Sequence, residues 1–265
     1  MKWMDWILIG INTYTFVKTT KAHHMKTMKL ALLGITAVLG AFTSYAQTAD
    51  EVVNKYLDAI GGKENWKKVS SVITEGNMSV QGADVLVTAT VVHGKGSRQD
   101  ISVMGMTGYQ IMTPTGGWSY MPFQGQAQAE PMTEEMVKKG ADQYDTQGAL
   151  VDYKDKGHNV EYLGKEDVDG TECHKLKITH KSGKEETYFL DPASYYLIKA
   201  ISKNNVNGQE VEMTTAFSNY KKLPEGIVIP MSISLPMGPG MMADMTITKV
   251  EINKPVADST FKPSN

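Results

Sequence analysis

The sequence has a single cysteine and a single arginine. Cys173 has no partner thiol within the 265 residues, so no internal disulfide can stabilise the chain. Arg98 stands alone among 27 basic residues. The segment up to Ala46 holds five of those basic residues and one of the 29 acidic residues, which leaves 22 basic and 28 acidic residues, a net charge of −6, for the remainder. This charge argues against a nucleic-acid partner and against charge-driven binding to anionic lipid.

Motifs for catalysis are also missing. Gly-x-Ser-x-Gly, His-Glu-x-x-His and Walker-type glycine loops do not occur. His174 and His180 lie on one face of a single expected strand, but six residues place them about 20 Å apart, too far for one metal ion. His93 and His158 have no partner at ligand spacing, so we interpret the histidines as solvated or locally bonded. Cys173 fits a small buried side chain better than a nucleophile. We expect no catalytic residue, no metal ligand and no cofactor.

The first 46 residues are typical of an export signal. Lysines precede the apolar run Leu30 to Phe42, and Thr43 to Ala46 place small residues at positions −3 and −1. The run is short for a membrane span, and no cysteine for lipid attachment follows it. We expect cleavage after Ala46, which leaves 47–265 as one domain. Residues 1–24 fit either a start codon assigned too far upstream or a long signal or anchor.

The chain after the signal opens with helix signals. Thr48 and Glu51 form a capping box, and apolar residues follow at helical spacing. Gly61 and Gly62 then end the pattern. We expect one amphipathic helix of about three turns.

Alternating segments separated by turn residues follow this helix. We count about ten or eleven strands between Val72 and Asn253, with one apolar and one polar face, which favours an antiparallel sheet. The stretch from Glu186 to Ala200 shows the pattern well, because Pro192 interrupts two runs rich in tyrosine and branched residues. We expect a turn there between two paired strands.

An insertion from Pro122 to His158 interrupts the strands. Thr133 can cap a short helix that ends at Gly140, and a second, weakly helical piece is expected from Asp142 to Tyr153. The expected fold is therefore mainly β with a few helices: an unclosed antiparallel half-barrel, with an N-terminal helix and a helical lid over an apolar hollow. We expect the lid, from about Met132 to Tyr153, to pack over the open end of the sheet and to be more mobile than the strands.

Methionine is abundant and gathers in two groups. The first group is Met104, Met106, Met112, Met121, Met132 and Met136, and the second is Met231, Met237, Met241, Met242 and Met245. An unbranched, adaptable side chain suits a cavity for variable apolar chains, but it also suits ordinary core packing. The sequence leaves both readings open.

Several motifs in a fixed order resemble one known family. They are "GGWSYMPFQG" from Gly116, "EYLGKEDVDGTECHKLKITH" from Glu161, "YFLDPASYYLIKA" from Tyr188 and "FSNYKKLPEGIVIPMSI" from Phe217. Together with the export signal and the capped helix, they resemble the LolA-like outer-membrane lipoprotein-sorting proteins of the Bacteroidetes type, over 47–265. The resemblance implies an unclosed, LolA/LolB-like β-barrel with a helical lid over a cavity for acyl chains.

The resemblance also sets functional expectations. It implies a monomeric periplasmic carrier, not an enzyme, for the acyl chains of lipoproteins or lipids, with membrane proteins as donor and acceptor. An envelope-stress sensor and a hydrolase of an envelope lipid or peptide are the alternatives. In such carriers a basic residue holds the lid closed, and Lys95 or Arg98 is the counterpart here. The expected ligand-binding residues are Arg98, Met104, Met106, Met112, Trp118, Phe123, Met132, Met136, Met231 and Met241.

Overall fold

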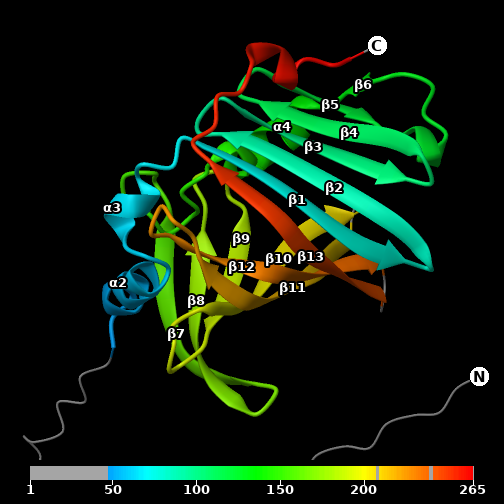
Figure 1. Cartoon of the computed structure of the whole chain (residues 1–265). Coiled ribbons are helices and arrows are strands. Elements are labelled where there is room, and N and C mark those ends of the chain that lie inside the picture. The colour runs from blue at the N-terminus through cyan, green and yellow to red at the C-terminus, as the bar shows by residue number, and fades with distance from the viewer. Residues whose placement is uncertain (1–46, 207–208, 239–240, 265) are drawn as a thin grey trace, which may run out of the picture. The chain divides into compact units, whose positions relative to one another are not determined.

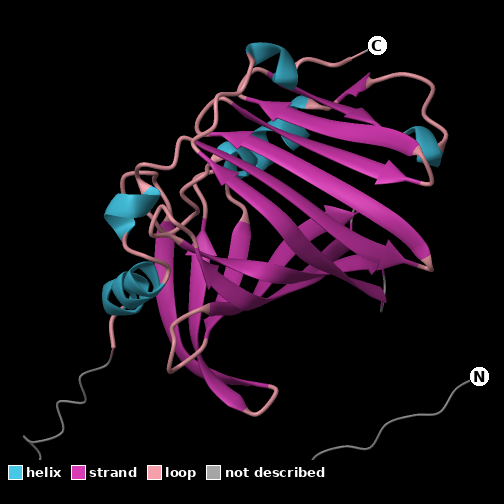
Figure 2. Ribbon diagram, viewed as in Figure 1, coloured by secondary structure: helices cyan, strands magenta, loops and turns pink. Residues whose placement is uncertain are grey.

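One antiparallel sheet dominates the fold (Figures 1 and 2). The computed structural model describes residues 47–206, 209–238 and 241–264, and the expected signal segment lies outside them. Within these ranges thirteen strands follow the order β6-β5-β4-β3-β2-β1-β13-β12-β11-β10-β9-β8-β7. The two end strands are not paired with each other, so the sheet is unclosed, and the expected fold class is confirmed.

The described residues form more strands than expected, and the two shortest lie just before the insertion and within it. The strands are β1 (Ser71–Val80), β2 (Ala83–Val92), β3 (Gly96–Val103), β4 (Met106–Thr113), β5 (Gly116–Tyr120), β6 (Glu130–Pro131), β7 (Asn159–Val168), β8 (Thr171–Thr179), β9 (Glu185–Leu190), β10 (Leu197–Val206), β11 (Gln209–Lys222), β12 (Val228–Gly238) and β13 (Met241–Ile252).

The first and last strands pair in the middle of the sheet. Val72 on β1 lies opposite Ile252 on β13, and Asn77 lies opposite Thr246. The edges are therefore β6 and β7, which are consecutive in the chain and are joined by the second half of the insertion. This connection must cross from one edge of the curved sheet to the other.

The N-terminal helix forms as its capping box predicts. Helix α2 (Ala49–Ala59) begins after Thr48, whose side chain accepts a hydrogen bond from the Glu51 amide while the Glu51 carboxylate accepts one from the Thr48 amide. Its buried side chains pack with apolar residues of the sheet; this cluster includes Val52, Val53, Leu57, Leu176, Ile178 and Leu190. A short helix, α3 (Lys63–Trp66), follows.

The turn predicted at Pro192 is confirmed. Leu190 on β9 pairs with Leu197 on β10, and the Asp191 carboxylate accepts hydrogen bonds from the Ala193 and Ser194 amides between them. An aspartate that bonds to amides two and three residues ahead stabilises a tight turn.

The insertion is less helical than expected. It contains the 3-10 helix η1 (Pro122–Gln124), helix α4 (Glu134–Lys139), capped by Thr133, and the 3-10 helix η2 (Gly140–Tyr144). The second helix expected from Asp142 to Tyr153 is wrong, because turns follow η2. Asp145 accepts a hydrogen bond from the Gln147 amide, and Gly148 has φ +78°, which a helix does not allow.

A C-terminal segment, residues 254–264, covers one face of β3, β4 and β5. Its 3-10 helix η3 (Asp258–Phe261) places Phe261 against Tyr109 and Ile111. No pattern in the sequence predicts this cover, because the segment lacks a periodic arrangement of apolar residues.

Among the described residues, no helix has the length and apolar character to cross a membrane.

Candidate binding site beneath the insertion

A pocket of about 710 Å³ lies between the insertion and the sheet. Gln110 and Met112 of β4 form one wall, and residues 182–185 of the β8–β9 turn form the opposite wall. Met132, Met136 and Asp142 contribute from the insertion. Strands β4 and β8 are far apart in the sheet order, so a pocket with walls from both lies inside the curve of the sheet. The volume is within the range of small-molecule sites, roughly 300 to 1,000 Å³.

The inner face of the neighbouring strands is apolar in part, because Gln99 and Gln110 lie opposite each other on it. Side chains two residues apart share a face of a strand, so Gly108 lies on the same face of β4 as Met112. The register extends this row through Ile101, Val87 and Gly76 to Ile247. Val87 and Ile247 are buried. This row of the inner face is thus built from branched residues and glycine.

Three of the methionines expected to bind ligand meet at this pocket. Met112 is buried, and a Cβ added at Gly140 would come within 2.5 Å of its methyl carbon. A Cβ at Gly117 would lie 2.9 Å from the Met132 sulfur. The two glycines therefore make room for methionine side chains. Met136, on α4, is 53% exposed at the mouth.

The other apolar residues that were expected to bind the ligand do not line this pocket. Met104 and Met106, at the β3–β4 hairpin, are 82% and 43% exposed, and Met241 is exposed on β13. Phe123 lies on η1, and Trp118 packs in the cluster beneath the C-terminal segment. Met231 is half-buried on β12. Met104 also borders a second hollow of about 820 Å³, whose lining includes Asp84 and Asp244.

Arg98 and Lys95 contact the C-terminal segment. Arg98 donates through Nε and Nη2 to the Asp100 carboxylate at 2.8 to 3.0 Å and through Nη1 to the Thr260 carbonyl at 3.2 Å. Its guanidinium lies 4.6 Å from the centre of the Tyr109 ring. Lys95 forms an ion pair with Asp258. These contacts do not involve the insertion, so they give no support to the lid role that the resemblance implied for either residue.

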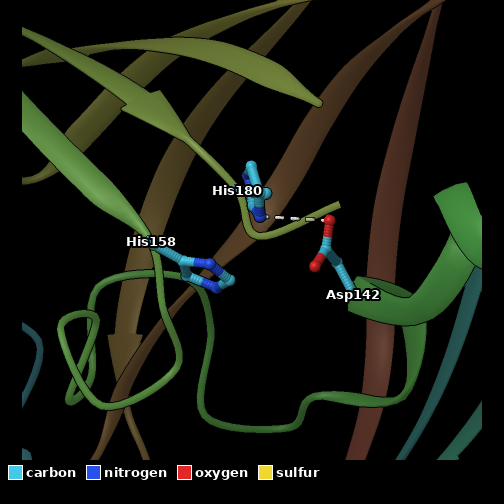
Figure 3. A group of neighbouring side chains, drawn as sticks. All are labelled: Asp142, His158 and His180. Atoms are coloured by element: carbon cyan, nitrogen blue, oxygen red, sulfur yellow. Dashed lines mark ion pairs between the residues drawn. The ribbon is translucent and has the colours of Figure 1, made fainter. Parts of the chain in front are cut away.

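A buried histidine joins the insertion to the sheet instead. His180 follows β8, and its Nδ1 lies 3.1 Å from Oδ2 of Asp142 on η2 (Figure 3). Its Nε2 lies 2.9 Å from Oε2 of Glu186 on β9. The Asp142 pair has an ion-pair distance but lacks the alignment of a hydrogen bond. His158 precedes β7, and its ring centre lies 4.7 Å from that of His180.

Neighbouring charges determine the protonation of this cluster. Burial alone would lower the pKa of His180, but the carboxylates of Asp142 and Glu186 outweigh it and raise that pKa to about 9. Burial would raise the pKa of Glu186, yet His180 and Lys184 hold it at about 2. Burial would raise the pKa of Asp142, but His180, together with Lys184 and His158, outweighs burial and lowers that pKa. Burial and the nearby His180 lower the pKa of His158.

Of the two alternatives for the histidines, solvated or locally bonded, the first does not hold for two of them, which bond to Tyr162 and Glu186 on the adjacent strands. His174 and His180 are 3% and 4% exposed. The distance between His174 and His180 along one strand also leaves out His158, which lies beside His180 across the hairpin. The signal was present, because the Asp169-Gly170 turn places residues just before β7 opposite residues just after β8: Asn159 pairs with Thr179. No pattern in the sequence predicts that Asp142 lies close to His180.

Three solved structures have a similar fold. A protein of the DUF1329 family from Desulfovibrio piger aligns with a TM-score of 0.52 at 14% identity, over 81% of this chain and 97% of its own. A putative outer membrane lipoprotein-sorting protein domain from Vibrio parahaemolyticus aligns with a TM-score of 0.50 at 14% identity, over 80% of this chain and 94% of its own. A LolA superfamily protein from Nitrosomonas europaea gives a TM-score of 0.52 at 16% identity, over 82% and 98%.

The sequence matches no family model and no curated protein. The three structural matches nevertheless span most of both chains, and each is an independent instance of the same architecture. The fold of this chain is LolA-like.

Proposed function

We propose that the protein binds the acyl chains of lipoproteins or lipids in the pocket beneath the insertion and carries them without catalysis. The observation that supports this most directly is the meeting of Met112, Met132 and Met136 at a pocket inside a LolA-like half-barrel. The similar proteins from V. parahaemolyticus and N. europaea are described as lipoprotein-sorting and LolA superfamily proteins. The expected export signal would place the carrier in the periplasm.

The two walls of the pocket suit the two ends of a lipid. The methionine side offers flexible apolar surface, and each methylene buried there contributes about 0.8 kcal/mol. The β8–β9 turn offers Ser182, Lys184 and Glu185, which can bond to polar groups. An acyl chain would lie along the methionines, with its polar end at the turn. Binding by burial alone requires no reactive residue.

Binding of a fluorescent fatty-acyl probe tests the proposal. Met136→Gln removes apolar surface from the pocket mouth at an exposed position, so the fold should be preserved. We expect the affinity to fall roughly threefold to tenfold, as expected for about one lost apolar contact group. Met104→Gln makes the same chemical change at an exposed hairpin residue outside the pocket and should leave the affinity unchanged. Absence of saturable binding to the unsubstituted protein, or an effect confined to Met104→Gln, would refute it.

A further inference from the structure

Asp142, which lines the pocket, forms a cluster with His158 and His180, which do not line it. Each residue offers one ligand atom, and the three atoms lie within 4.8 Å of one another. Figure 3 shows the two imidazoles and the carboxylate converging from three segments of the chain. We propose that these residues bind one divalent transition-metal ion, with zinc the best match.

The unsatisfied atoms of the cluster support a bound ion. Oδ2 of Asp142 and Nδ1 of His180 are buried, and neither makes a hydrogen bond within the described residues. Buried polar atoms without a hydrogen bond are uncommon in folded proteins, and here only the ion-pair contact between the two atoms compensates for their burial. Their separation of 3.1 Å is close to the spacing of two ligands on one tetrahedral zinc ion, whose bonds to nitrogen and oxygen are about 2.0 to 2.2 Å. An ion between them would satisfy both.

The surroundings of His180 resemble the outer shell of a metal site. Its Nε2 is engaged by the Glu186 carboxylate, which leaves Nδ1 to face the cluster. Glu186 is held in turn by Lys184 at 2.7 Å and by the Tyr188 hydroxyl at 3.1 Å. Carboxylates that accept from the far nitrogen of a ligating histidine fix its tautomer and increase its basicity.

His158 can complete the site with a small rearrangement. Its Nδ1 accepts a hydrogen bond of 3.1 Å from the Lys181 amide. Coordination through that nitrogen would exchange the hydrogen bond for a metal bond and would bring the ring closer to His180. The three protein ligands would leave a fourth tetrahedral position for water.

The ligand set and the charge indicate which ion fits. Two imidazoles and one carboxylate suit zinc, cobalt or nickel, whereas calcium and magnesium prefer oxygen ligands. With neutral imidazoles, Asp142, Glu186 and Lys184 sum to a charge of −1, which favours a cation. The ion would link the insertion to the ends of β7 and β8, beside the pocket. Metal binding at this cluster does not require an acyl chain in the pocket.

Metal titration tests this site directly. The purified protein is stripped with a chelator and titrated with Zn²⁺ by calorimetry and with Co²⁺ by visible absorption. We expect one ion per chain. His158→Gln and Asp142→Asn should weaken binding by at least the roughly 10- to 100-fold typical of lost metal-site partners. Glu186→Gln removes no ligand and should weaken it less.

His174→Gln is the matched control. His174 is buried to the same extent as His180 and lies on β8, which His180 follows, but it bonds to the Tyr162 hydroxyl rather than to the cluster. This variant should retain the affinity of the unsubstituted protein. No binding to the unsubstituted protein, or equal affinity in all the variants, would show at most an adventitious ion and would overturn the proposal. Circular dichroism of each variant confirms that the fold is retained.

Discussion

At the scale of single residues, Arg98 shows what one side chain contributes to stability. Its planar fork donates to both oxygens of Asp100 and to the Thr260 carbonyl, a set of hydrogen bonds that the point charge of a lysine does not reproduce. We predict that Arg98→Leu lowers the free energy of unfolding by about 1 to 3 kcal/mol, because Asp100 loses its partner and the C-terminal segment loses an anchor. Thermal melting should shift down by roughly 2 to 10 °C.

Arg98→Lys separates the effect of geometry from that of charge. It should melt between the unsubstituted protein and Arg98→Leu. The affinity for the fatty-acyl probe should stay the same in both variants, because Arg98 and Met112 lie on opposite faces of the sheet. A large change in affinity with unchanged melting would instead support the lid role implied by the family resemblance.

Cys173 illustrates how burial suppresses reactivity. The side chain is fully buried with Val168 and Phe189, and this burial, with some help from Asp191, raises the pKa of the thiol. The thiolate is the reactive form, so we predict very slow modification by a thiol reagent at pH 8 in the native protein and rapid modification in denaturant. Fast modification of the native protein would show that this part of the sheet opens readily.

At the scale of elements, the insertion divides into two parts of different stability. Helix α4 has no buried residue, and the side chains at its ends are exposed. Farther along, the Thr146 hydroxyl donates to the Val69 carbonyl, and Leu150 and Val151 are buried in the cluster with α2. The lid expected over Met132 to Tyr153 is therefore shorter, because its last third belongs to the core.

Hydrogen exchange should reveal this division. We predict fast exchange for the amides of α4 and slow exchange around Val151, comparable to Leu176 on β8. The reason is that local opening of α4 exposes little apolar surface, whereas opening near Val151 breaks a packed core. Uniformly slow exchange across the insertion would mean that the pocket has no gate there.

The sequence predicted those elements whose signals are local. The capping box at Thr48, the turn at Pro192 and the cap at Thr133 each act within a few residues, and the structure has all three. Contacts between distant segments left no comparable pattern. The C-terminal cover over Tyr109 and the approach of Asp142 to His180 depend on how far the sheet curves, which no short motif encodes.

At the scale of the whole molecule, the sheet order makes folding depend on the end of the chain. Strand β13 lies between β1 and β12, so the two halves of the sheet are joined only when the last strand is in place. Pairing residues about 170 positions apart has a high entropic cost and predicts slow folding. The C-terminal segment that follows β13 only covers a face that is already formed.

Two truncations distinguish these roles. We predict that a chain ending at Gly238 does not melt cooperatively, since it lacks β13 and leaves β1 and β12 as unpaired edges in the middle of the sheet. A chain ending at Asn253 retains every strand but loses Phe261, which is 6% exposed against Tyr109 and Ile111. That chain should fold with its stability reduced by about 3 to 5 kcal/mol, the usual effect of losing a buried aromatic side chain. Circular dichroism melting measures both. A cooperative transition at the full-length temperature in the shorter chain would show that the two halves of the sheet fold without their central link.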